Sequence, residues 1–254
     1  MLSKVTRVVP AGVALSLFIA SLAAAQTPPK TNPPDITGVW AILRGGRGAD
    51  PKLLPPPPTE MVLEPAYARP YEARRAAERE GDARGEPLAN GGTACIPYGM
   101  PQMMSAIYPL EVLQSRGQIT IVAEAFSEVR RIYLDQPQAK MGEVAPGFYG
   151  NSVGQWEGDA LMVDTIGIKP SVLGYRSMPH SDQLRIKEEI KLVAPDVLHD
   201  RITVEDPVTL EKPWTFTFAY RRMAPTYKML EYVCENNRDY IDENGVTRLK
   251  LKDK

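Results

Sequence analysis

The sequence predicts an all-β protein, an antiparallel up-and-down β-barrel with one short helix and proline-rich N-terminal arms. Seven runs of strand length, rich in Val, Ile, Thr and aromatic residues, follow Ile107. Gly, Pro, Asn and Asp separate these runs, which is typical of closely spaced antiparallel strands. The chain left after an N-terminal signal, roughly 230 residues, fits one barrel domain.

The N-terminus has the pattern of an export signal. Lys4 and Arg7 precede a short apolar run that ends in small residues, including Ala23 and Ala25. A charged start, an apolar middle and small residues at the cleavage point define a secretory signal peptide. We therefore predict that residues 1–25 are removed and that the protein is periplasmic or secreted. No second long apolar stretch follows, so the mature chain is expected to have no membrane span.

The next segments are predicted to be arms and a helix. Proline-rich pieces at residues 27–35 and 53–60 favour extended conformations and cannot join a central strand. Residues 26–60 are thus expected to form an arm that carries the first strand. Strong helix formers with dense charge predict one solvated helix near residues 64–82. It belongs to the barrel domain, which is expected to span residues 61–254.

Charge and motifs exclude several kinds of partner. Lys and Arg total 30 against 31 Asp and Glu, without a basic stripe, so nucleic acid and anionic membranes are not expected partners. The glycines at residues 45–48 lack the lysine-threonine ending and the strand-to-helix setting of a phosphate loop. We expect no nucleotide and no other cofactor, and the sequence does not indicate an oligomeric state.

The two cysteines, Cys95 and Cys234, are expected to form a disulfide bond in an exported protein. Two free thiols are the alternative. A zinc site needs more ligands than two widely spaced cysteines and two histidines readily provide, so we expect no metal.

A histidine stands at the start of an alternating run, in MPHSDQLRIKEEIKL. Successive residues of a strand point to opposite faces, and here the even positions are the apolar ones. Glu188 is a carboxylate within that apolar set. His180 and Asp182 share its face if the strand begins early enough. A buried carboxylate needs a partner or a wet cavity, so this face is predicted to line a pocket; a bulge or a half-covered face is the alternative.

Other strands offer further pocket residues. The stretch WTFTFAYRR places aromatic rings on one face, with an ordinary aromatic core as the alternative. One of two successive arginines in SEVRRIYLD must point inward: Arg131 shares a face with Tyr133, whereas Arg130 shares one with Ile132. An inward arginine is a natural partner for Glu188 or for a ligand carboxylate. The predicted substrate-binding residues are Arg131, Tyr133, Asp164, Trp214, Phe216, Phe218 and Tyr220.

These residues predict a cofactor-independent enzyme that acts on a small apolar or aromatic molecule by proton transfer, as a lyase, hydratase or isomerase. His180 would be the acid/base, Asp182 would orient it, and Glu188 would complete the polar end of the pocket. A nucleophilic triad is not expected, because no GxSxG motif is present. A non-catalytic small-molecule-binding barrel is the first alternative, and a cell-envelope interaction module with a filled barrel is the second.

Several segments, taken together, resemble a family of exported bacterial proteins of unassigned function. They are GVWAI, CIPYGMP, PLEVLQ, VRRIYLD, GNSVGQWEGDALMVDT, HSDQLRI and PWTFTFAYRR, which span most of the mature chain. The opening Gly38-x-Trp40 is also similar to the first strand of lipocalin-like (calycin) barrels. That resemblance implies that the tryptophan closes the barrel floor, that Arg221 or Arg222 packs across it, and that the barrel holds a small apolar ligand.

Overall fold

The computed structural model describes residues 32–46, 49–88, 95–172, 174–233 and 239–249. From Pro33 onward these residues belong to one compact unit. The predicted signal peptide and Cys234 lie outside the described residues. Signal cleavage and the bond between Cys95 and Cys234 therefore stay predictions.

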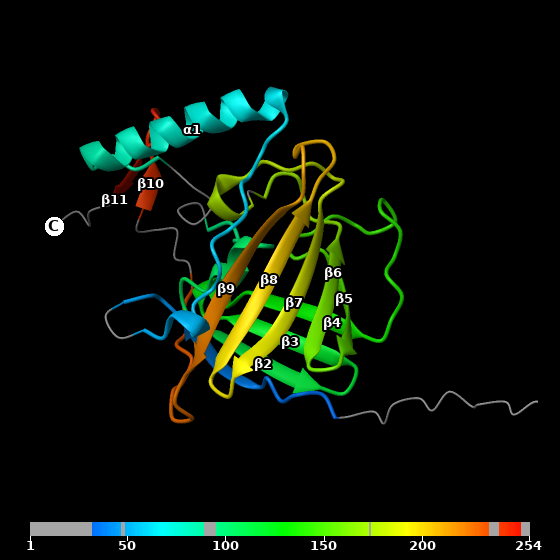
Figure 1. Cartoon of the computed structure of the whole chain (residues 1–254). Helices are drawn as coiled ribbons and strands as arrows, with labels where there is room; N and C mark the ends of the chain where they lie inside the picture. Colours follow the sequence, from blue (N-terminus) through cyan, green and yellow to red (C-terminus); the bar gives the residue numbers. More distant parts are fainter. Residues whose placement is uncertain (1–31, 47–48, 89–94, 173, 234–238, 250–254) are drawn as a thin grey trace, which may run out of the picture. The chain divides into compact units, whose positions relative to one another are not determined.

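Within the described chain, nine strands form a closed barrel, so the predicted barrel fold is confirmed. Each strand pairs with the next one along the chain, and β9 closes the barrel by pairing antiparallel with β1. The strands, shown in Figure 1, are β1 (Gly38–Ile42), β2 (Leu110–Ser115), β3 (Gln118–Ala123), β4 (Val129–Leu134), β5 (Asn151–Glu157), β6 (Ala160–Ile166), β7 (Arg185–Ala194), β8 (Val197–Glu205) and β9 (Trp214–Arg222).

One pair of neighbours departs from the antiparallel rule. β4 and β5 pair in parallel, from Ile132↔Ser152 to Leu134↔Gly154. A parallel pair needs a crossover of about a dozen residues or more, because the chain must return to the end at which the first strand began. The segment between Leu134 and Asn151 provides that length.

Tight hairpin turns join two pairs of successive strands. β2 and β3 pair up to Ser115↔Gln118, and β5 and β6 pair up to Glu157↔Ala160. Gly117 and Gly158 have φ angles of 79° and 63° at these turns. Left-handed angles of this kind suit glycine, which has no Cβ to clash with the backbone.

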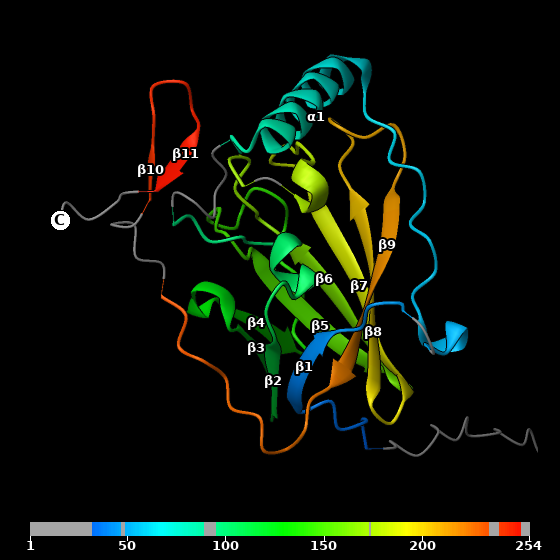
Figure 2. The same cartoon turned by 90° about the vertical axis from the view of Figure 1, so that its left-hand side faces the viewer.

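The helix α1 (Pro65–Arg84) matches the predicted segment. It lies at the end of the barrel where β9 begins, as both views show (Figures 1 and 2). Tyr67 and Tyr71 pack against the barrel core, whereas most other side chains of the helix are at least partly exposed. Gly85 ends the helix in the left-handed conformation.

A small hairpin near the C-terminus is separate from the barrel sheet. It consists of β10 (Asp239–Ile241) and β11 (Thr247–Leu249). Its turn residue Val246 forms a β-bridge with Leu88, just after α1. The Arg248 side chain forms a salt bridge of 3.2 Å with Glu86.

The first strand carries a tryptophan that contacts an arginine of the last barrel strand, and the closed barrel is compatible with a calycin-like one. Trp40 is fully buried, and its Nε1 donates to the carbonyl oxygen of Ile36 at 3.0 Å. The guanidinium of Arg222, not that of Arg221, lies over the Trp40 ring at 4.2 Å from the centroid. Gly38 has a φ of 138°, which suits glycine, and a Cβ there would come within 2.8 Å of Arg222 Nη1 and displace that side chain.

Candidate ligand-binding site

The barrel wall has a gap along β9. On one side of the gap, the N–H of Leu43 donates to Ala219 O at 2.7 Å, just after β1 ends. On the other side, the N–H of Thr59 donates to Thr215 O at 2.8 Å. The stretch of β9 between these two bonds has no paired strand on that edge among the described residues, and the proline-rich arm passes beside it.

The inner face of β9 carries aromatic side chains, as the alternation in WTFTFAYRR predicts. Trp214, Phe216, Phe218 and Tyr220 are all buried. Tyr175 of the short 3-10 helix η4 (Tyr175–Ser177) packs against them, with ring centroids 4.9 Å from Phe216 and 5.0 Å from Phe218. The predicted aromatic wall is therefore present.

An open pocket of about 490 Å³ lies at the gap, and we call it the edge pocket. Aromatic rings and prolines form its apolar surface. Its charged lining residues are two arginines from different elements, Arg44 after β1 and Arg176 of η4. The residues that line it are Ile42, Leu43, Arg44, Pro55, Pro56, Pro57, Pro58, Ser105, Tyr175, Arg176, Phe216, Thr217, Phe218 and Ala219.

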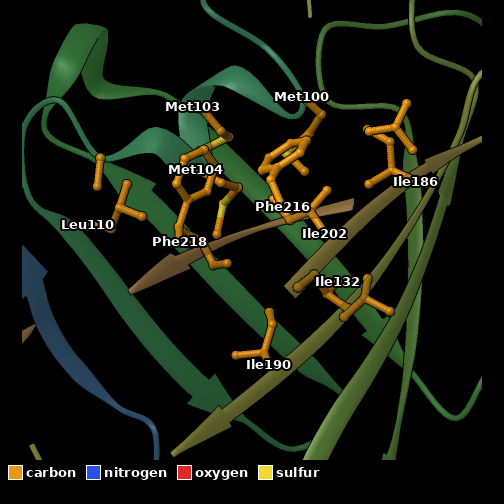
Figure 3. Packing of buried hydrophobic residues seen from close by; sticks show 14 of the residues in the cluster. Met100, Met103, Met104, Leu110, Ile132, Ile186, Ile190, Ile202, Phe216 and Phe218 are labelled. Atoms are coloured by element: carbon orange, nitrogen blue, oxygen red, sulfur yellow. The ribbon is translucent and has the colours of Figure 1, made fainter. Parts of the chain in front are cut away.

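The cavity deeper inside the barrel is too small for an organic ligand. The 3-10 helix η2 (Gln102–Ser105) inserts Met103 and Met104 into the core, next to the rings of β9 (Figure 3). The cavity bounded by Met104, Trp40 and Tyr220 measures only about 10 Å³. Such a volume holds at most one water molecule. The internal ligand cavity implied by the lipocalin resemblance is thus absent from this part of the barrel.

A buried ion pair occupies the barrel interior instead. Arg130 and Glu188 are completely buried and form two hydrogen bonds, one of them from Nη1 to Oε1 at 2.7 Å. The guanidinium also donates to Ser152 Oγ and, at 3.1 Å, to Thr165 Oγ1. The burial of Arg130 lowers its pKa and the Glu188 charge raises it, with a net upward direction. The prediction that Glu188 points inward and meets an arginine is confirmed, but its partner is Arg130.

Asp200 belongs to the same interior group, and sequence reasoning missed it. Its side chain is fully buried, and neither carboxyl oxygen accepts a hydrogen bond from a described donor. Burial raises the pKa of Asp200 well above its usual value, and the neighbouring Glu188 charge raises it further. A protonated Asp200 can donate to Glu188, which accounts for two carboxyl groups side by side in an apolar interior. The alternation that identified Glu188 would also have found Asp200, which shares the buried face of β8 with Leu198 and Ile202.

The predicted catalytic residues are not joined into one group. β7 begins at Arg185, so His180 and Asp182 lie in the preceding loop rather than on the strand with Glu188. His180 is buried, its Nδ1 lies 2.9 Å from Ser181 O, and its Nε2 has no partner among the described residues. Asp182 is exposed, and its Oδ1 accepts a hydrogen bond from Gln183 at 3.1 Å. The expected strand geometry, in which Asp182 orients His180, is therefore not observed.

Three predicted substrate-binding residues point outward. Arg131 and Tyr133 are exposed, because β4 turns the alternate face, with Arg130 and Ile132, toward the interior. Asp164 also faces outward and forms a bidentate salt bridge with Arg185, with distances of 2.6 and 2.7 Å. The interior placement expected for these three side chains was wrong.

A second open pocket, of about 710 Å³, lies against the outer faces of β5, β6 and β7. Its cationic lining residues already have anionic partners. Arg185 pairs with Asp164, and Lys187 pairs with Glu205 at 2.7 Å. The edge pocket differs, because no described residue forms an ion pair with Arg44 or Arg176. We call this second pocket the outer pocket. An anionic ligand would have to compete there with Asp164 and Glu205 for the cationic side chains, whereas in the edge pocket it would displace no described ion pair.

Another buried carboxyl lies outside the barrel interior, just before β4. Glu128 accepts a hydrogen bond from the backbone N–H of Tyr98, and its Oε2 has no partner among the described residues. Burial raises the pKa of Glu128 to about 7. Glu128 therefore titrates near neutral pH and contributes to the pH dependence of stability.

Comparisons with protein-family models and with curated proteins found no match for this chain. Among the described helices, none combines the length and the apolar character needed to cross a membrane. The function is therefore inferred from the geometry of the site.

Proposed function

We propose that the protein binds a small apolar or aromatic molecule, without chemical conversion, in the edge pocket. One observation carries this proposal: Phe216 and Phe218 of β9, together with Tyr175, line an open pocket of about 490 Å³ at a gap in the barrel wall. Ligand pockets commonly measure about 300–1,000 Å³ and are lined mainly by apolar and aromatic groups with a few polar ones.

The setting of the pocket also supports binding there. Trp214 Nε1 donates to Thr59 O at 3.1 Å, which fixes the proline-rich arm against β9. Prolines have restricted backbones, so this wall loses little conformational entropy when a ligand binds. Tyr175 is held among the β9 rings, and the aromatic surface is therefore largely formed before binding.

Titration with a neutral apolar fluorophore, N-phenyl-1-naphthylamine, tests the proposal. Ser105 lines the edge pocket and is half-buried, so Ser105→Trp should fill part of it and weaken binding about tenfold. Ser115→Trp, at an exposed serine at the end of β2, is the matched control and should bind like the parent protein. Equal affinity in Ser105→Trp and Ser115→Trp would contradict binding in this pocket.

The acid/base enzyme remains a second candidate because of one observation. The Nε2 of His180 is buried without a partner among the described residues, so a ligand that reached this nitrogen could form a hydrogen bond with it. Incubation with a metabolite extract, followed by mass spectrometry, would distinguish retention from conversion. A converted compound whose conversion stops in His180→Gln, while its binding persists, would favour the enzyme over the binding protein.

The proposed site of action is the periplasm or the exterior of the cell. The support for this is the signal pattern of residues 1–25. N-terminal sequencing of the exported protein should begin at Gln26. Recovery of the protein with Met1 intact would contradict export by cleavage.

A further inference from the structure

The edge pocket has an excess of positive charge that no residue in the described part of the chain neutralises. Arg44 and Arg176 both line it, and no Asp or Glu does. Neither guanidinium forms a salt bridge with a described residue. Each arginine carries five N–H donors and stays charged at all physiological pH values. The pocket can therefore supply charge-assisted hydrogen bonds to an anionic ligand.

The segment that carries Arg176 is held in a strained conformation. Arg176 and Ser177 have φ angles of 58° and 61°, in the left-handed region that non-glycine residues rarely adopt. The helix α1 supports this segment, since Tyr71 Oη donates to Arg176 O at 3.2 Å. The Arg176 guanidinium also lies 5.6 Å from the Tyr175 ring centroid. Supported strain of this kind often positions a functional side chain.

The exposed edge of β9 adds a backbone donor. Alternate residues of an antiparallel strand direct their N–H and C=O groups to the same side. Thr215 bonds to Thr59 and Ala219 bonds to Leu43 on the side of the gap, so Thr217 must point its backbone groups there as well. Thr217 lies between these two bonds and lines the edge pocket. Its N–H can donate to a ligand oxygen.

We infer that the edge pocket selects apolar or aromatic ligands that carry a carboxylate, which Arg176 and Arg44 bind while the ring system packs on Phe216 and Phe218. This inference rests on the proposed binding function and adds the chemical class of the ligand. The Thr217 N–H donates to the same carboxylate. A bidentate carboxylate contact suits the planar guanidinium, whereas a neutral amide of the same shape would lose the charge attraction.

Displacement of N-phenyl-1-naphthylamine by 2-naphthoate and by 2-naphthamide tests the inference, because the two competitors share one ring system. In the parent protein, 2-naphthoate should displace the fluorophore at a concentration about tenfold lower than 2-naphthamide does. Arg176→Gln should reduce that preference to about threefold or less, with Arg44→Gln having a smaller effect in the same direction. The affinity for 2-naphthamide should not change in either variant.

Arg131→Gln is the matched control, because Arg131 is an exposed arginine on the outer face of β4. It should keep the full preference for 2-naphthoate. Equal displacement by the two competitors, or an unchanged preference in Arg176→Gln, would overturn the inference while leaving the proposed binding function intact. Failure of the neutral fluorophore to bind in the edge pocket would overturn both.

Discussion

The arginine inside the barrel and the two arginines of the edge pocket have opposite surroundings. Arg130 is fully buried, and Glu188, Ser152 and Thr165 accept its hydrogen bonds. Arg44 and Arg176 are exposed at an open pocket and have no ion-pair partner among the described residues. Arg130 has few donors left for a ligand, so its role is structural. The donors of the edge pocket remain available, and binding is expected there.

The largest effect should come from removal of the negative charge around Arg130. Glu188→Gln combined with Asp200→Asn leaves the buried guanidinium without a counter-charge and should lower the free energy of unfolding by about 3–5 kcal/mol. Glu188→Gln alone should lower the free energy of unfolding by a smaller amount, because loss of the Glu188 charge allows Asp200 to ionise beside Arg130. Urea unfolding at neutral pH measures both variants.

Equal losses in the single and double variants would contradict the idea that Asp200 can replace Glu188. The double variant Arg130→Met with Glu188→Gln is the control, because it removes both members of the charged pair. Replacement of a buried ion pair by uncharged residues is often close to neutral. Its free energy of unfolding should therefore lie well above that of the variant with an unpaired Arg130.

The next effect is a pH dependence that comes from Asp200. Its folded-state pKa is raised above 3.8, so the folded protein keeps a proton that the unfolded chain releases. The stabilisation is complete below the unfolded pKa and is lost as the pH rises toward the folded pKa, by about 1.4 kcal/mol per pH unit. Asp200→Asn should abolish this part of the slope above pH 4, as measured by urea unfolding.

Glu128 contributes to the slope with the same sign, because its pKa is raised from 4.5 to about 7. Glu128→Gln should therefore also reduce the slope over this range, and the double variant should have the smallest slope. A slope in Asp200→Asn equal to that of the parent protein would show that Asp200 is ionised in the folded state.

The smallest effect is expected at the edge pocket. Arg44→Gln and Arg176→Gln should each change the free energy of unfolding by less than about 0.5 kcal/mol, because these exposed side chains form no ion pair with a described residue. Urea unfolding of the two variants, next to Arg131→Gln, checks this. A loss of several kcal/mol in Arg176→Gln would mean that Arg176 stabilises the fold as Arg130 does.

Strand periodicity predicted the barrel and much of its interior, but it could not select between two similar faces. Trp214 to Tyr220 and Glu188 were placed inward because their strands alternate clearly. In β4, Val129, Arg131 and Tyr133 look as suitable for the core as Arg130, Ile132 and Leu134. Arg130 is the arginine that faces inward because it pairs with Glu188 when the barrel closes. Local patterns cannot show this contact, since the two residues lie 58 positions apart in the sequence.

The edge pocket could not be predicted from local patterns. It depends on where β1 stops along β9, on the position of the arm that meets Thr215, and on the insertion of Tyr175 from η4. Each of these contacts joins segments far apart in the sequence. His180 is conspicuous in the sequence because histidine is rare in this chain, yet β7 begins only at Arg185, and His180 therefore lies in a loop.

A crystal structure of the protein grown with 2-naphthoate tests the central claim most directly. The naphthalene ring should pack on Phe216 and Phe218 in the edge pocket, with its carboxylate about 3 Å from the guanidinium of Arg176. A ligand found next to Asp200 inside the barrel, or in the outer pocket beside Arg185, would contradict the claim.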